Sequence, residues 1–260
     1  MKDCIVSFRK RIEGVEIPTQ LNNPFGSIIS EIAKIAATEL QDYIAQNESQ
    51  WGHNFGFDQS MEQGVKGKMF GVLVVRKSNN DLGYLATFSG NLIADCEDNQ
   101  FVPSVFDPAV DDYFINHGMT ELTDLSDQIK ALKANQNLKN QPRIAELKEI
   151  RKKKSYELQQ KLFENYHFTN INGLTQNLID IFSIPVHKRP AAGTGECAAP
   201  KLLEYALQHN LKPISIAEFW WGRSSKSVER VHKAYYPACQ NKCRHLLEYM
   251  LDDLTLFEKA

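Results

Sequence analysis

The chain lacks the features of a membrane, secreted or strongly charged protein. No apolar run approaches the ~20 residues that a membrane-spanning helix needs. The residues from Met1 to Val6 carry no signal-peptide pattern. The net charge of −2 over 260 residues gives no general attraction to nucleic acid or to a membrane surface. We therefore expect a cytoplasmic protein of one or two domains, with no membrane partner.

Cysteine is scarce, and its pattern excludes a secreted disulfide framework. The five cysteines are odd in number, and three of them, Cys197, Cys239 and Cys243, fall in the last third of the chain. In a reducing compartment such thiols are free, catalytic or bound to a metal ion. The same third holds two of the three tryptophans, so we expect a functional site there.

The middle of the chain lacks glycine and nearly lacks proline. Between 121 and 166 there is no glycine, and the one proline, Pro142, suits the first turn of a helix. Apolar residues recur at helical spacing on both sides of it, which predicts an antiparallel helical hairpin. Between Asp127 and Glu164 there are ten Lys or Arg against five Asp or Glu.

The rest of the chain alternates strands with helices. Two apolar runs, 69–75 and 82–88, flank a polar turn and predict a β-hairpin within 68–90. A third strand is expected at 213–221. Helices are expected at 27–46, with Ser27 as N-cap, at 197–209 and at 243–254.

This order predicts an α/β or α+β fold, with a mixed sheet flanked by helices and a protruding antiparallel helical hairpin. We expect an N-terminal α+β part at 1–118 and the basic hairpin as an insertion at 119–168. A C-terminal part at 169–260, with the Cys and Trp motifs, is expected to pack on 1–118 as one domain.

The cysteine spacing allows a zinc site. Cys239 and Cys243 would lie on one side of a helix, and three intervening residues fall within the range seen for zinc ligands. Cys197, at another helix start, and His232 are the further donors that the sequence offers. The alternative is that these cysteines are small buried apolar residues.

Three further patterns each have two interpretations. The turn Gly193-Thr194-Gly195 before a helix could hold a phosphate or be a plain helix entry. Trp220 and Trp221 face opposite sides of a strand, so one is expected in the core while the other stacks on a base or meets a partner protein. The candidate RNA-binding residues are Arg151, Lys152, Lys153, Lys154, Trp221, Arg223 and Lys226. The alternative for the basic run 151–154 is a solvated helix face that binds no RNA.

In combination, these motifs resemble the N-terminal extension of large bacterial RluA-type RNA pseudouridine synthases. The similar segments are Gly195–Leu203, Ala217–Gly222, Tyr236–Cys243, and the hairpin strands Gly67–Val74 and Gly83–Gly90. The resemblance covers about 25–252. It implies an accessory module that associates with rRNA or tRNA and with a covalently linked or associated synthase domain. The family's catalytic Arg-Leu-Asp motif does not occur here, so the isomerase activity is not expected in these residues.

A second resemblance is to the zinc-dependent cytidine-deaminase layout. Those enzymes pair a His/Cys-x-Glu at one helix start with Pro-Cys-x-x-Cys at another. Here Cys197-Ala198-Ala199 and Pro237-Ala238-Cys239 with Cys243 echo both motifs, but alanine stands at 199 in place of the catalytic glutamate. The alternative function is therefore a zinc-dependent nucleotide or base deaminase-like domain, which is inactive unless Glu196 replaces that glutamate.

Overall fold

The computed structural model divides the chain into two compact units. It describes residues 4–57, 67–90, 100–106, 113–135, 137–186, 189–224 and 229–252. The sheet unit comprises Met1–Val105, Phe168–Gln176 and Gly193–Ala260, and the helical unit comprises Phe106–His167 and Asn177–Ala192. Within the described ranges, no helix has the length and apolar character needed to span a bilayer.

The sheet unit is built on four strands in the order β2-β1-β5-β6. The bounds are β1 (Lys68–Arg76), β2 (Leu82–Phe88), β5 (Lys212–Trp221) and β6 (Tyr235–Tyr236). All neighbouring pairs are antiparallel, and a parallel bridge from Ala86 to Phe101 adds a mixed element beside β2. The expected α+β class is confirmed.

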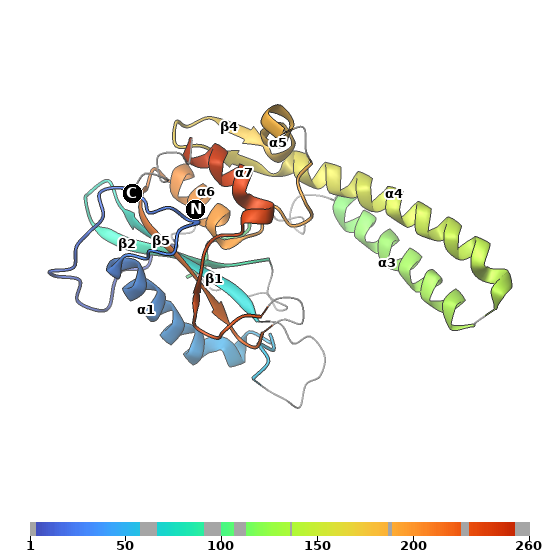
Figure 1. The fold of residues 1–260 in the computed structure, drawn as a ribbon, viewed down its shortest axis with the longest axis horizontal. Coiled ribbons are helices and arrows are strands. Elements are labelled where there is room, and N and C mark those ends of the chain that lie inside the picture. The colour runs from blue at the N-terminus through green and yellow to red at the C-terminus, as the bar shows by residue number, and fades with distance from the viewer. Residues whose placement is uncertain are drawn as a thin grey trace. The chain divides into compact units, whose positions relative to one another are not determined.

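Helices cover both faces of this sheet. Helix α1 (Glu31–Asn47) lies on one face and is followed by the 3-10 turn η1 (Glu48–Gln50), while α6 (Ala198–Gln208) lies on the other face (Figure 1). Helix α7 (Gln240–Leu251) packs on α6. Because both faces are covered, β5 is buried along nearly its whole length.

The N-cap of helix α1 lies three residues later than the sequence predicts. Its N-cap is Ser30, whose hydroxyl accepts the N–H of Ala33, and not Ser27. Ile28 is 80% exposed and takes no part in the apolar face, which begins at Ile32. The serine nearest the first buried turn therefore acts as the cap.

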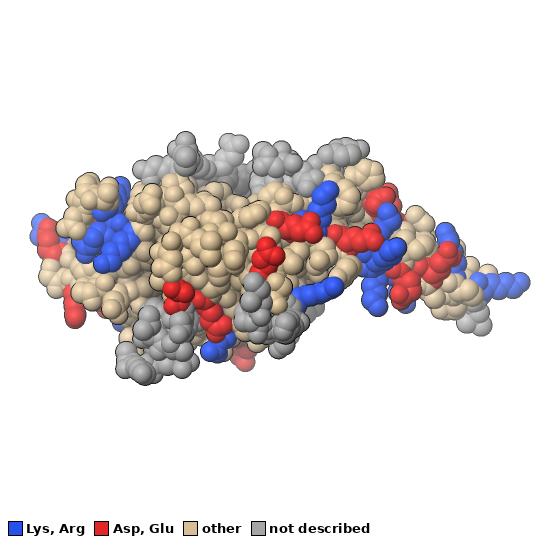
Figure 2. All heavy atoms as spheres, turned by 90° about the horizontal axis from the view of Figure 1, so that it is seen from above, with Lys and Arg blue, Asp and Glu red and all other residues tan. Residues whose placement is uncertain are grey.

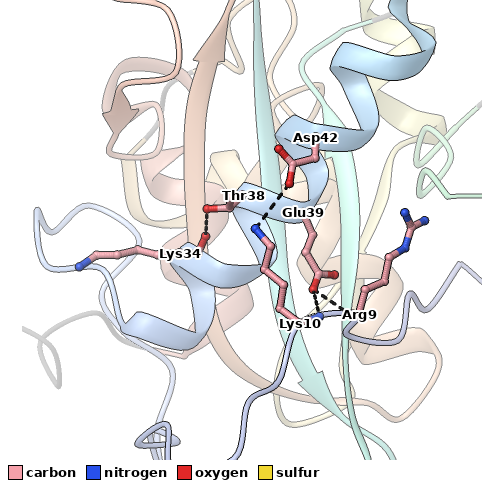
Figure 3. A network of polar contacts seen from close by, with 6 residues as sticks. All are labelled: Arg9, Lys10, Lys34, Thr38, Glu39 and Asp42. Atoms are coloured by element: carbon pink, nitrogen blue, oxygen red, sulfur yellow. Dashed lines mark hydrogen bonds and ion pairs between the residues drawn. The ribbon is translucent and has the colours of Figure 1, made fainter.

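A buried carboxylate ties the N-terminal segment to α1. Glu39 is buried, and its Oε1 accepts the backbone N–H groups of Arg9 and Lys10 at 2.9 and 2.7 Å (Figure 3). On the surface nearby, Lys10 pairs with Asp42 at 3.4 Å. The buried pair of hydrogen bonds is the stronger restraint, because exposed ion pairs contribute little.

The helical unit is an antiparallel hairpin with one further helix. Helices α3 (Tyr113–Ala134) and α4 (Gln141–Asn165) are joined through η2 (Leu138–Asn140), and α5 (Leu178–Val186) contacts α4. Ile129, Ile144 and Leu147 form a small core between α3 and α4. This unit is larger than the insertion expected at 119–168, since it includes 177–192. A separate strand pair, β3 (His167–Thr169) and β4 (Thr175–Asn177), follows α4.

Candidate functional site

Three thiols converge where two helices begin. Cys197 is the N-cap of α6, Cys239 is the N-cap of α7, and Cys243 lies one turn into α7. Each thiol is within hydrogen-bonding reach of the other two. We call Cys197, Cys239 and Cys243 the thiol cluster. The sequence predicted the participation of all three, and the fold brings them together.

Backbone N–H groups make the thiol cluster favourable for negative charge. Hydrogen bonds from the thiols of Cys197 and Cys243, together with the N–H groups of Lys242 and Asn241, hold the pKa of Cys239 well below its usual range. The same hydrogen bond to Cys239, together with one to Cys243 and burial, raises the pKa of Cys197. The first negative charge in the cluster therefore resides on Cys239, at the positive end of the α7 dipole.

Cys243 retains its proton more strongly. Its hydrogen bond with Cys197 lowers its pKa, but the hydrogen bond to Cys239 and burial outweigh that effect and raise the pKa to about 12. The N–H of Gly195 also donates to the Cys243 thiol. The Gly193-Thr194-Gly195 turn therefore serves the thiol cluster through its backbone.

The thiol cluster has the donors of a metal centre but not its finished geometry. Three thiolates are a donor set that suits zinc, and backbone N–H groups already stabilise their charge. Yet no set of three or more His, Cys, Asp or Glu side chains in the described ranges is arranged so that it could hold a metal ion.

His232 makes its contacts elsewhere. Its ring centroid lies 4.5 Å from that of Trp221 and 5.0 Å from that of Phe57, and its Nδ1 accepts the N–H of Gly222 at 3.1 Å. Burial lowers its pKa, which favours the neutral ring. These contacts assign His232 to the packing around Trp221, and they do not support its expected role as a zinc ligand.

A buried carboxylate, which the sequence analysis did not single out, lies beside the thiol cluster. Glu218 is on β5 and 6% exposed, and its Oε1 accepts the backbone N–H of Ala199 at 3.1 Å. Burial, with a smaller contribution from the charge of Cys239, raises the pKa of Glu218 to about 7, although the hydrogen bond from Ala199 and the charge of Arg230 oppose this shift. The carboxylate thus lies at the backbone of position 199, where the deaminase pattern places its glutamate side chain.

Gly71 makes this arrangement possible. A Cβ added at Gly71 would lie 2.8 Å from the Cβ of Ala198 and 3.4 Å from the Cγ of Glu218. The absent side chain therefore allows the start of α6 to approach β1 closely. This approach positions Cys197 and Ala199 beside β5.

Glu196, the expected alternative acid or base, lies next to a lysine. Burial raises its pKa, and the charge of Lys201 opposes that shift. The ammonium of Lys201 is buried and donates to the carbonyls of Phe88 and Gly90 at 3.0 and 3.1 Å. The carboxylate whose charge acts on Cys197 is Glu218.

A pocket adjoins Glu218 at the β6 edge of the sheet. Its volume is about 110 Å³. Its walls come from the segment before α1, from β5 and from β6 with the residues that follow it. The lining includes Asn22, Ser27, Ile29, Glu218, Tyr235, Tyr236 and Pro237.

The expected base-stacking tryptophan is in the core. Trp221 is only 2% exposed, and its Nε1 donates to Glu48 at 2.6 Å, so stacking on RNA through Trp221 is wrong. Trp220, on the other face of β5, is also buried, because both faces of the strand are covered. Arg223 is exposed, while Lys226 lies outside the described residues.

The basic run on α4 is partly engaged within the hairpin. Arg151 donates to Ser126 at 2.8 Å, and Lys154 pairs with Glu121 at 2.7 Å. Lys153 lies 3.9 Å from Glu157, and Lys152 is exposed without an ion-pair partner among the described residues. Both signs of charge alternate along this hairpin in Figure 2.

Comparisons with known proteins give no match: no protein-family model, no curated protein and no solved structure is similar to the chain.

Proposed function

We propose that the sheet unit is a zinc-dependent, deaminase-like domain with its centre at the thiol cluster. The observation that carries the proposal is the meeting of Cys197, Cys239 and Cys243 at two helix starts, beside the buried carboxylate of Glu218. Two helices that begin at one point with cysteine ligands are the arrangement of this enzyme class.

The residues divide into two roles. The three cysteines would hold the ion, and the N–H groups of Gly195, Asn241 and Lys242 would stabilise their negative charge. A bound zinc ion lowers the pKa of a coordinated water and so supplies a nucleophile at neutral pH. Glu218, held by the Ala199 N–H, is the carboxylate placed to exchange protons within the pocket.

Metal content of the purified chain tests the proposal. We expect about one zinc per chain, lost in Cys239→Ala and retained in Cys4→Ala. Cys4 is a matched control, since it is buried in the same unit and its thiol donates to the carbonyl of Phe101 at 3.4 Å. A chain that binds no zinc would refute the proposal.

Ammonia release separates an enzyme from a structural zinc domain. The zinc-loaded chain should release ammonia from a cytidine compound, and Glu218→Gln should stop this release while keeping the zinc. Release that persists in Glu218→Gln but stops in Glu196→Gln would move the catalytic role to Glu196. Zinc without any ammonia release would leave a structural metal site.

A second candidate function is RNA association as an accessory module of an RluA-type synthase. It is supported by the exposed side chains of Arg151, Lys152 and Lys153 on α4. Binding to structured RNA should weaken steeply with salt. Replacing these three residues by glutamine should reduce both the affinity and its salt dependence, and binding that ignores salt would count against this function.

A further inference from the structure

The thiol cluster also places one accessible thiol directly beside another. The sulfur of Cys239 accepts hydrogen bonds from the thiols of Cys197 and Cys243, so all three sulfurs are neighbours. Cys197 and Cys239, at the two helix starts, are partly exposed, whereas Cys243 is fully buried. A small oxidant in the solvent therefore has access to Cys197 and Cys239 but not to Cys243.

The neighbouring backbone favours Cys239 as the thiol that reacts first. The N–H groups of Asn241 and Lys242, at the start of α7, donate to its sulfur. These donors stabilise negative charge on that sulfur, and the thiolate is the form of cysteine that attacks an oxidant. Cys197 donates a hydrogen bond to the same sulfur and is therefore in position to react with it in a second step.

We infer that Cys239 is a site of oxidation by hydroperoxides, and that Cys197 resolves it into a disulfide between the starts of α6 and α7. The inference goes beyond the deaminase-like function, because the disulfide itself forms without a metal. Only its consequence for zinc rests on the proposed function. Two of the three cysteine ligands are lost in the oxidised chain, so the ion binds only to the reduced chain.

The reaction consumes one hydroperoxide. The sulfur of Cys239 attacks one peroxide oxygen, the O–O bond breaks, and the other oxygen leaves as water or an alcohol after it takes the thiol proton. The Cys239 sulfur then carries a hydroxyl group. The sulfur of Cys197 attacks this oxidised sulfur, the S–S bond forms, and the hydroxyl leaves as water with the proton of the Cys197 thiol. Both sulfurs are oxidised, and the peroxide is reduced.

The geometry of a helix decides the partner of Cys239. Cys243 lies four residues further along, and its N–H donates to the Cys239 carbonyl at 3.2 Å in the first turn of α7. Residues at this spacing hold their Cβ atoms about 5–6 Å apart, whereas a disulfide needs about 3.5–4.5 Å. Cys197 belongs to another helix and is not subject to this spacing. The hydroxyl of the buried Thr194 donates to the Lys242 carbonyl at 3.4 Å, which ties the segment before Cys197 to α7.

Peptide mapping after peroxide treatment identifies the bond directly. Metal is removed from the full chain with a chelator, hydrogen peroxide is added, the remaining thiols are alkylated, and the chain is digested with trypsin without reduction. Because trypsin cleaves after lysine and arginine, the three cysteines fall on separate peptides: 189–201, 234–242 and 243–244. We expect peptide 189–201 to be joined to 234–242, and a dithiol reductant should separate the pair.

Substitutions test the two roles. Cys239→Ser should abolish the joined peptides. Cys197→Ser should also abolish them, but it should leave Cys239 as a sulfenic acid that a dimedone reagent labels. Cys4→Ser is the matched control, because the Cys4 thiol is buried in the same unit and donates to the carbonyl of Phe101, so the joined peptides should form as before.

The outcomes separate this inference from the proposed function. Absence of joined peptides under conditions that oxidise free cysteine overturns the inference, even when the chain binds zinc. A bond between 234–242 and 243–244 overturns the role of Cys197. Joined peptides from a chain that never binds zinc support the inference and refute the metal centre. In a zinc-loaded chain, peroxide should release the ion as the joined peptides form and reduction should restore binding; zinc that stays bound to the oxidised chain overturns the effect on the metal.

Discussion

Gly71→Ala should disturb both the fold and the thiol cluster. The new Cβ would lie 2.8 Å from the Cβ of Ala198 and 3.1 Å from Leu202 Cδ1. Apolar carbons pack at about 3.5–4.0 Å, so the start of α6 must move back by about 0.7–1.2 Å. Overpacking of this kind costs about 1–3 kcal/mol, and alanine regains about 0.5–1 kcal/mol over glycine within a strand. We therefore expect the free energy of unfolding to fall by about 1 kcal/mol, within a range of roughly 0–2.5 kcal/mol.

Tryptophan fluorescence during urea unfolding is the assay. All three tryptophans, Trp51, Trp220 and Trp221, lie in the sheet unit, so the signal reports on that unit alone. Zinc content should fall with stability, because Cys197 precedes the displaced Ala198.

A double variant provides the control. Gly71→Ala combined with Ala198→Gly removes the clashing methyl group and should restore most of the loss, apart from the small helix-propensity cost of glycine. If Gly71→Ala is as stable as the parent chain and binds as much zinc, the close approach of α6 does not position the site.

Two further predictions concern buried charges. Burial lowers the pKa of Lys201 to about 8, against the opposing charge of Glu196 and in concert with that of Lys68. Because the unfolded chain keeps this proton up to about pH 10.4, the free energy of unfolding should rise between pH 8 and 10 through this residue. Lys201→Met should remove this rise when the free energy of unfolding is measured against pH. An unchanged dependence on pH would contradict the burial argument. Glu39→Ala should destabilise the sheet unit by about 2–4 kcal/mol, since it leaves two backbone N–H groups without their acceptor. Faster exchange of the Arg9 and Lys10 amide protons would show that their hydrogen bonds are lost. The control Lys34→Ala, on the exposed side of α1, should have almost no effect on this exchange. Equal exchange rates in the two variants would refute the role of Glu39.

Local patterns in the sequence predicted the elements well. The β-hairpin and the strand at 213–221 agree with β1, β2 and β5 within one residue at each end, because apolar runs bounded by turn residues have few alternatives. Helix α7 begins at Gln240, three residues before the expected start, because Cys239 acts as its N-cap. With this start, Cys239 at the N-cap and Cys243 in the first turn of α7 both lie in the thiol cluster.

Errors arose where the outcome depended on tertiary packing. The prediction that one of two adjacent tryptophans is exposed assumed that only one face of the strand is buried, whereas α1 and α6 cover both faces of β5. The prediction of His232 as a zinc ligand relied on its closeness to Cys239 along the chain. In the structure, the turn before β6 directs its ring to Trp221. The spacing of residues in the sequence does not show in which direction a side chain points.

Glu218 had a signal that could have been used. It is the one charged residue in the apolar run from Ile214 to Trp221. A charged side chain in a strand that is buried on both faces is rare unless it is paired or has a function. Its partner, the Ala199 N–H, belongs to the backbone and is therefore invisible in the sequence.

The arrangement of the sheet unit explains why the thiols, the carboxylate and the pocket occur together. Antiparallel pairing of β1 with β5 sets Gly71 opposite Glu218, so the absence of a side chain on one strand gives space for a carboxylate on the next. The helix start that enters this space presents its free N–H to that carboxylate, and the residue before it is Cys197. One small residue on the central strand thus determines the separation between the metal-binding candidates and the candidate proton carrier. Any variant that widens this separation should therefore impair zinc binding, whereas variants in the pocket wall away from the thiol cluster should leave it unchanged.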